Sequence, residues 1–177
     1  MTTQNKAQSS AGRRPKSSLS VDLVADAGDW PAEEDCSLIV QQAADAVACW
    51  PGLIKGAASV SVALSSDAEV AILNGQFRAK PKPTNVLSFP AGFGAEPGFL
   101  GDIILAFETV EREAAEQAIT LNDHVQHLIV HGILHLLGFD HEKAAGAERM
   151  EALEISILAE LGIANPYTGD LDTAKKE

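Results

Sequence analysis

Hydrophobic and polar residues follow two different periods along this chain. A period of two is typical of a strand with one buried face, and recurrence every three or four residues is typical of an amphipathic helix. Alternating or short apolar stretches predict strands at Leu19–Val24, Ser59–Leu64, Asn85–Phe89 and Asp102–Phe107. Helical spacing predicts helices at Glu33–Trp50, from Asp67 to the break at Lys80-Pro81, at Glu108–Gln117, from Asp123 to Gly138, and at Ala144–Leu161.

Turn-forming residues separate these elements. Pro51-Gly52 ends the first helix, and Pro90–Gly98, with three glycines and two prolines, must be a loop. Asp67 and Asp123 stand where each can cap the helix that follows it.

The mixture of strands and helices predicts the fold class. We expect one α/β (α+β) domain at residues 19–163, with a small, mostly four-stranded mixed sheet, about five helices and a metal site on a central helix. We see neither an internal repeat nor a linker between two cores, and the strand order cannot be inferred. Residues 1–18 are predicted to be a disordered basic tail, and residues 164–177 a polar tail.

Composition supports a globular protein. Of the 177 residues, 46% are hydrophobic, and no apolar run reaches the about 18 residues of a membrane helix. The basic N-terminal stretch lacks the apolar core of a secretory signal, and a targeting or RNA-contacting role is the alternative to disorder. Cys36 and Cys49 fall about 20 Å apart on one predicted helix, so we expect small buried side chains, no disulfide and a reducing compartment.

Three histidines predict a metal site. His131 and His135 lie one helical turn apart and can direct two imidazoles to the same ion. Gly138 can end the helix in the left-handed conformation, after which the chain can deliver His141 as a third ligand. Three nitrogen ligands leave the fourth position of tetrahedral zinc open, as in catalytic sites, whereas histidines that are merely buried and hydrogen-bonded are the simpler alternative.

The same histidine spacing occurs in metzincin metalloproteases, where a glutamate follows the first histidine and acts as the general base. Here that residue is Gly132, so the base of a peptidase is missing. Asp140 either orients a ligand histidine or caps the turn. His127 lies one turn before His131, and we interpret it as supporting the site or lining a groove.

A basic segment precedes the third predicted strand. Arg78, Lys80 and Lys82 place three cations within five residues, in a chain with a net charge of −12 and a pI near 4.7. The overall charge excludes a broad nucleic-acid surface but not a local one. Intervening prolines keep the cations in fixed positions, and a guanidinium beside a metal-activated water suits a phosphoryl group. Arg78 also has a simpler role, because a cation is favourable at a helix C-terminus.

Four motifs in order resemble the YbeY endoribonucleases, a family of bacterial rRNA maturation factors. They are FRAKPKPTNVLSFP (Phe77–Pro90), LGDI (Leu100–Ile103), HGILHLLGFDH (His131–His141) and MEALE (Met150–Glu154). The resemblance extends from about Leu19 to Leu161.

This resemblance implies a cytoplasmic, metal-dependent endoribonuclease specific for single strands, which matures the 3′ end of small-subunit rRNA and acts in ribosome quality control. It implies one Zn²⁺ per chain, held by His131, His135 and His141, and an essential arginine at Arg78. We take His131 and Arg78 as catalytic. The implied partners are single-stranded RNA, rRNA and the small ribosomal subunit, with no membrane and no DNA. Further candidates for substrate contacts are Lys80, Lys82 and Ser88.

The expected reaction is attack of a metal-activated water on an RNA phosphodiester, with Arg78 stabilising the phosphate. Attack by the RNA 2′-hydroxyl is the alternative. Asp102 either orients a ligand, shapes the pocket floor or is a turn residue at the start of a strand. Two other classes of protein remain: a metzincin-like metalloprotease, and a non-catalytic zinc-containing ribosome assembly factor in which His127 or Asp140 closes the coordination sphere.

Overall fold

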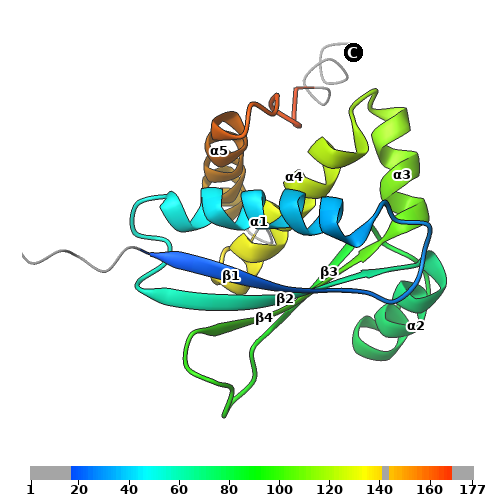
Figure 1. The fold of residues 1–177 in the computed structure, drawn as a ribbon, viewed down its shortest axis with the longest axis horizontal. Coiled ribbons are helices and arrows are strands. Elements are labelled where there is room, and N and C mark those ends of the chain that lie inside the picture. Colours follow the sequence, from blue (N-terminus) through cyan, green and yellow to red (C-terminus); the bar gives the residue numbers. More distant parts are fainter. Residues whose placement is uncertain (1–16, 141–143, 169–177) are drawn as a thin grey trace, which may run out of the picture.

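The structure is a computed structural model that describes residues 17–140 and 144–168. Within these residues, four strands form one sheet with five helices around it (Figure 1). In chain order the elements are β1 (Ser18–Ala25), α1 (Glu33–Cys49), β2 (Ala57–Ser65), α2 (Asp67–Arg78), β3 (Val86–Pro90), β4 (Phe99–Ala106), α3 (Phe107–Glu116), α4 (Leu121–Leu136) and α5 (Ala144–Glu160). The predicted α/β class is confirmed.

The sheet is mixed and has the order β1-β2-β4-β3. Strands β1, β2 and β4 are parallel, whereas β3 runs antiparallel to β4 at the edge. Parallel neighbours need a crossover connection, which α1 supplies between β1 and β2, and α2 together with β3 supplies between β2 and β4. The short strand β3 therefore has one hydrogen-bonded side and one free side.

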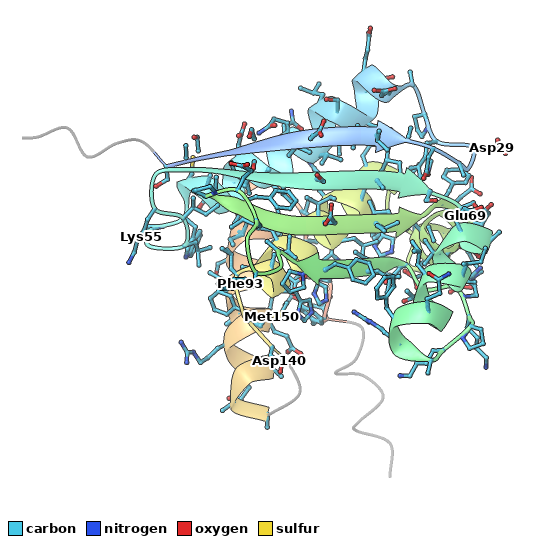
Figure 2. All side chains as sticks on the ribbon, turned by 90° about the horizontal axis from the view of Figure 1, so that it is seen from below. Asp29, Lys55, Glu69, Phe93, Asp140 and Met150 are labelled. Carbon is cyan, nitrogen blue, oxygen red and sulfur yellow. The ribbon has the colours of Figure 1, made fainter. Side chains whose placement is uncertain are left out.

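The helices cover the two faces of the sheet unequally. Helices α1, α3, α4 and α5 lie on one face, and α2 lies at one end of the other face (Figure 1). Figure 2 looks onto this second face, most of which no helix covers. On the first face, alternate residues of β2 and β4 pack against α1 and α4. The fully buried residues of this core include Val60, Val62 and Leu64 of β2, Ile103 and Leu105 of β4, Val40 and Val47 of α1, and Ile129 and Ile133 of α4.

The two predicted helix caps were each placed wrongly. Ser66 caps α2 by accepting a hydrogen bond from the Glu69 amide, and Thr120 caps α4 by accepting one from the Asp123 amide at 3.0 Å. The N-cap is the residue whose side chain accepts a hydrogen bond from the backbone amide of the third helical residue. Asp123 provides that amide in α4, so it lies inside the first turn rather than before it.

Several element boundaries also differ from the prediction. Strand β4 begins at Phe99, which pairs with Ser59 across an irregularity in the ladder, rather than at Asp102. Of the two cysteines, Cys36 is buried but Cys49 is exposed, and both are free thiols. Among the described residues, no helix is both long and apolar enough to cross a membrane.

Candidate metal and phosphate site

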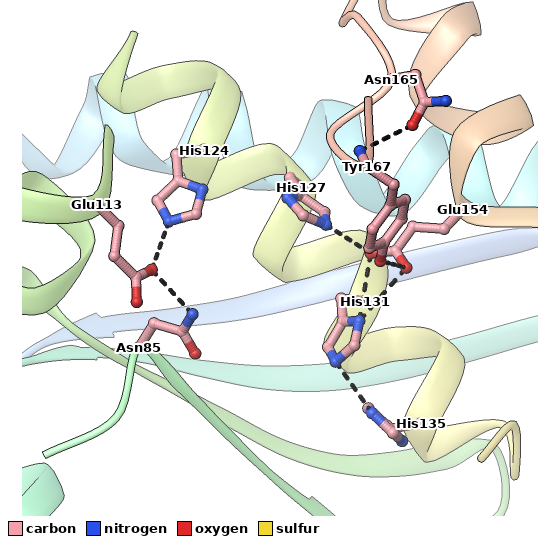
Figure 3. A network of polar contacts seen from close by, with 9 residues as sticks. All are labelled: Asn85, Glu113, His124, His127, His131, His135, Glu154, Asn165 and Tyr167. Atoms are coloured by element: carbon pink, nitrogen blue, oxygen red, sulfur yellow. Dashed lines mark hydrogen bonds and ion pairs between the residues drawn. The ribbon is translucent and has the colours of Figure 1, made fainter. Parts of the chain in front are cut away.

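Helix α4 carries His131 and His135 on the side that faces the end of α5 and the turn after α4 (Figure 3). Their Nε2 atoms lie 3.0 Å apart, and their rings meet edge to face with centroids separated by 4.6 Å. The predicted convergence of the two imidazoles is present.

The turn after α4 orients His135. Gly138 adopts the left-handed conformation with φ of +91°, which ends the helix as the sequence predicts. The Phe139 amide then donates to the carbonyl oxygen of Leu134 at 3.0 Å. The Phe139 carbonyl in turn lies 3.1 Å from Nδ1 of His135. The turn at Gly138 therefore places the Phe139 carbonyl oxygen beside Nδ1 of His135, the nitrogen that does not face His131.

The far nitrogen of His131 faces a buried carboxylate from α5. Nδ1 of His131 lies 3.2 Å from Oε1 of Glu154, and Nε2 of His127 lies 2.8 Å from the same oxygen. The Tyr167 hydroxyl donates to Oε2 of Glu154 at 2.7 Å. Burial alone raises the pKa of Glu154, but the hydrogen bonds from His127 and His131 outweigh burial and lower this pKa to about 2. The pKa of Tyr167 is raised by burial and by the adjacent carboxylate.

The hydrogen-bond partners fix the lone pairs of both rings. A carboxylate and a carbonyl oxygen only accept, so neutral His131 and His135 donate through Nδ1 and carry lone pairs on Nε2. Two lone pairs that face each other at 3.0 Å repel unless a cation lies between them. Two nitrogens of one tetrahedral zinc ion, with Zn–N bonds of about 2.0–2.1 Å, lie about 3.3 Å apart. The pair thus fits two ligands of one ion; His141, the third predicted ligand, lies outside the described residues.

Gly132 lies where α4 packs closely on β3 and β4. A Cβ atom at this position would come within 2.9 Å of Cδ1 of Ile103 and 3.1 Å of Oγ of Ser88. A side chain at this position, where a metzincin has its general base, would displace the side chains of Ile103 and Ser88. The missing side chain instead allows α4 to lie close to β3 and β4.

A cavity of about 670 Å³ lies between His135 and the basic segment. Arg78 and Lys80 line it together with Ser88 from β3, and His135 and Asp140 line it from α4 and the following turn. Arg78 thus lies on the same cavity as a predicted metal ligand, although 57 positions separate Arg78 from His135. Lys82 is exposed and is not among the residues that line this cavity.

The end of α2 holds the basic segment in place. Ala79 adopts the left-handed conformation at the C-cap, and the Lys80 amide donates to the carbonyl oxygen of Asn74 at 3.2 Å. The buried Asn74 side chain donates to the Lys82 carbonyl oxygen at 2.8 Å. These bonds, in addition to the prolines, fix the backbone on which Arg78 and Lys80 stand.

Two other sequence candidates lie away from this site. Asp102 lies on the second face of the sheet, in a groove that Asp22 and Phe77 also line, so it neither orients a ligand nor shapes the pocket floor. Adjacent strand residues point to opposite faces, and its neighbour Ile103 is the one that meets α4. His127 turns Nε2 toward Glu154, which agrees with a supporting role.

Sequence reasoning missed Glu154 and Tyr167. Glu154 is fully buried among Met150, Ile157 and Leu158 on the apolar side of α5, and an acid on an apolar helix stripe is a readable signal because burial of an unpaired charge is costly. Tyr167 is the only tyrosine of the chain. It falls in the stretch predicted to be a polar tail from residue 164, yet it packs against the domain.

A second polar network links three elements beside the site. Nε2 of His124 lies 2.8 Å from Oε2 of Glu113, which also accepts a hydrogen bond from Asn85 at 2.9 Å (Figure 3). Burial lowers the pKa of His124, although the Glu113 carboxylate acts in the opposite direction. This network joins α4 to α3 and to the residue before β3.

A histidine from a converging pair and a guanidinium on one cavity of a small α/β domain suit a hydrolase that acts on phosphate esters. The sequence model of the family described as endoribonuclease YbeY matches residues 28–162. The chain belongs to this family.

Individual relatives agree. An endoribonuclease YbeY of Allorhizobium ampelinum is 44% identical over 163 residues, which cover 86% of this chain and 97% of that protein. One of Parvibaculum lavamentivorans is 42% identical over 179 residues, with 95% of each chain covered. The solution structure of TM1509 from Thermotoga maritima has a TM-score of 0.53 and 27% identity, and the match covers 80% of this chain and 91% of that one.

Proposed function

We propose that this chain is a zinc-dependent endoribonuclease that cleaves single-stranded RNA and matures the 3′ end of small-subunit rRNA in the cytoplasm, with a further role in ribosome quality control. Family membership supports the reaction class, which is cleavage of RNA. The observation that carries the proposal is the cavity shared by Arg78, Lys80 and His135. It combines cations suited to phosphate with a histidine suited to a metal ion.

The residues of the cavity divide the chemistry between them. His131, His135 and His141 would hold a zinc ion, which would supply a Lewis acid beside the scissile phosphate and lower the pKa of water. Arg78 pairs with the non-bridging oxygens of the scissile phosphate and stabilises the charge that develops on them. Lys80 adds a second positive charge, and the Ser88 hydroxyl is available to donate a hydrogen bond to the RNA backbone.

The charge distribution supports an RNA substrate over a peptide. Two cations line this cavity in a chain whose net charge is −12, so the cavity is a local exception to an acidic protein. A peptidase also needs a general base, and glycine at position 132, packed against Ser88 and Ile103, supplies none. Nε2 of His127 faces Glu154, which disfavours a structural zinc site that uses His127 as fourth ligand.

Substitution of Arg78 and His135 tests the division of roles. We expect His135→Ala to lose both bound zinc and RNA cleavage. We expect Arg78→Ala to retain zinc and to cleave single-stranded RNA about 100- to 1000-fold more slowly, because one donor to the developing charge is lost. The measurements are zinc content of the purified protein and the cleavage rate of a labelled single-stranded RNA.

Arg112→Ala is the matched control, because Arg112 bonds Thr109 within α3 and does not line the cavity. Its cleavage rate should equal that of the wild type. Wild-type cleavage by Arg78→Ala with zinc bound would refute the phosphate role. Chelator-sensitive peptide cleavage by the wild type would favour the metalloprotease instead.

The end groups of the products identify the nucleophile. Attack by a metal-activated water yields fragments without 2′,3′-cyclic phosphates. Cyclic ends that persist under initial-rate conditions would show that the RNA 2′-hydroxyl attacks.

The rRNA role is tested on immature small subunits. We expect the wild-type protein to shorten the 3′ end of precursor rRNA in such particles, and Arg78→Ala to leave it unprocessed. Equal 3′ ends with both proteins, mapped by sequencing, would rule out this substrate while leaving RNA cleavage intact.

A further inference from the structure

Glu154 is the most deeply buried acid among the described residues, and three polar side chains contact its carboxylate. His127 and His131 approach it from α4, and Tyr167 approaches it from the segment after α5 (Figure 3). Its side chain has no exposed area. A buried carboxylate is stabilised by polar partners: His131 and Tyr167 contact Oε2, and Oε1 lies within ion-pair distance of His127 and His131.

The contacts of Glu154 constrain His131 at one atom. Its two oxygens lie 3.2 Å and 3.4 Å from Nδ1 of His131, so the ring is oriented by a bifurcated contact. An acceptor on Nδ1 keeps the proton there and leaves the lone pair on Nε2, which is the atom that faces His135 at 3.0 Å. The buried acid therefore selects the tautomer that a metal ion requires.

Tyr167 constrains Glu154 in turn. Its hydroxyl lies 2.7 Å from Oε2, and the ring packs edge to face on His127 with centroids separated by 6.0 Å. Tyr167 lies beyond residue 162, where the match to the family ends. The chain thus supports its histidine site with a residue from outside the matched region.

We infer that Glu154 and Tyr167 are positioning residues, which hold His131 with its proton on Nδ1 and its Nε2 directed at the metal. The inference rests on the proposed function, because it takes His131 as a ligand of zinc. Carboxylates that accept from the second nitrogen of a ligand histidine orient the ring and raise its basicity, and their loss weakens metal binding.

Zinc affinity is the first test. By competition with a chromophoric chelator, we expect Glu154→Gln to raise the zinc dissociation constant about 10- to 100-fold. Tyr167→Phe removes one donor to Glu154 and should raise the dissociation constant about 2- to 10-fold. Glu113→Gln is the matched control, because Glu113 also contacts a histidine of α4 but that histidine, His124, does not face His135. It should bind zinc as tightly as the wild type.

The tautomer of His131 in the zinc-free protein is a second test that needs no activity. Nitrogen-15 NMR should show the proton of neutral His131 on Nδ1 in the wild type and in Glu113→Gln. We expect the Nδ1 preference to fall in Tyr167→Phe and to fall further in Glu154→Gln, because a neutral amide oxygen is a weaker acceptor than a carboxylate. Should Glu154→Gln fail to fold, as judged by circular dichroism, Tyr167→Phe carries both tests because it removes only a hydroxyl.

The outcomes separate this inference from the proposed function. Wild-type affinity and an unchanged tautomer in the variants of Glu154 and Tyr167 would overturn the positioning role and leave the zinc enzyme standing. Equal weakening by Glu113→Gln would also overturn it, because the effect would then be a general loss of packing. A wild-type protein that binds no zinc would overturn the proposed metal site and the positioning role together.

Discussion

The absence of a side chain at Gly132 affects the site in two ways. It removes the acid of a peptidase, and it allows α4 to approach β3 and β4 so closely that Ser88 and His135 line one cavity. A residue interpreted from the sequence only as a missing base is therefore also a packing requirement.

Substitution of Gly132 by alanine should destabilise the fold. The new methyl group would meet Cδ1 of Ile103 at 2.9 Å, and overpacking of this kind costs about 1–3 kcal/mol, which exceeds the gain of about 1 kcal/mol in helix propensity. Urea denaturation measures the change in the free energy of unfolding. Gly75→Ala in α2 is the control, because its methyl group would meet only the Pro81 ring, at 3.3 Å.

We expect the free energy of unfolding of Gly75→Ala to remain within about 1 kcal/mol of the wild-type value. That of Gly132→Ala should be lower than the wild-type value. Equal stability of the two variants would show that α4 can move away from the sheet at no cost. The larger Gly132→Glu substitution should not give a folded protein.

At the residue scale, the sequence is informative where spacing alone sets geometry. The interval between His131 and His135 is fixed by the helix, and Gly138 ends it as predicted. The contacts of Glu154 depend on how α5 and the segment after it pack on α4, and no periodicity encodes that packing. The shared cavity of Arg78 and His135 likewise depends on the position of β3 at the sheet edge.

At the scale of elements, α4 is the helix on which the others converge. Its first turn is tied to α3 through His124 and Glu113, its middle packs on the sheet at Gly132, and its last turns carry the histidine pair.

The link between α3 and α4 predicts a pH dependence. Burial lowers the pKa of His124 below its ordinary value of 6.5 despite the contact with Glu113, and repulsion from His127 acts in the same direction. Below pH 6.5 the unfolded chain therefore binds a proton that the folded chain does not. The stability that neutral His124 provides is complete above pH 6.5 and is lost as the pH falls through the lowered pKa.

His124→Gln should reduce this dependence, because an amide can still donate to Glu113 but does not titrate. The decline in the free energy of unfolding between about pH 7.5 and about pH 5.5 should be smaller in the variant, as measured by urea denaturation at each pH. An equal decline in the two proteins would mean that other groups cause it, and an NMR titration of His124 would check its pKa directly.

The sequence predicted which elements exist better than how they are arranged. Each of the four strands and five helices expected is found among the described residues, because burial of one face imposes its period on the sequence. The predicted boundaries were wrong where pairing with another strand sets the end of an element. Phe99, for example, belongs to β4 because it pairs with Ser59. The strand order depends on crossovers between distant segments and leaves no local trace in the sequence.

At the scale of the whole molecule, metal binding should appear as stability. A ligand that binds only the folded state stabilises it by about 2.7 kcal/mol at 100 times its dissociation constant. For a domain of this size that corresponds to a rise in Tm of roughly 5–10 °C. We expect added Zn²⁺ to raise the Tm of the chelator-treated protein and chelator to reverse the rise.

His135→Ala isolates the site in this experiment. It removes one of two converging nitrogens, so zinc should leave its Tm unchanged. A rise in Tm for His135→Ala as large as that of the wild type would place the bound zinc elsewhere on the protein.

The parallel order of the sheet also has a consequence for the time course of folding. Ser18 pairs with Ala57, and Ser59 with Phe99, so each parallel pairing must close a long loop before its first hydrogen bond forms. Such pairings are slow, whereas a helix forms in about a microsecond. His131 and His135 need only α4, but the cavity that adds Arg78 needs the completed sheet edge. On the proposed function, a folding chain would therefore form the histidine pair before the cavity that would bind RNA.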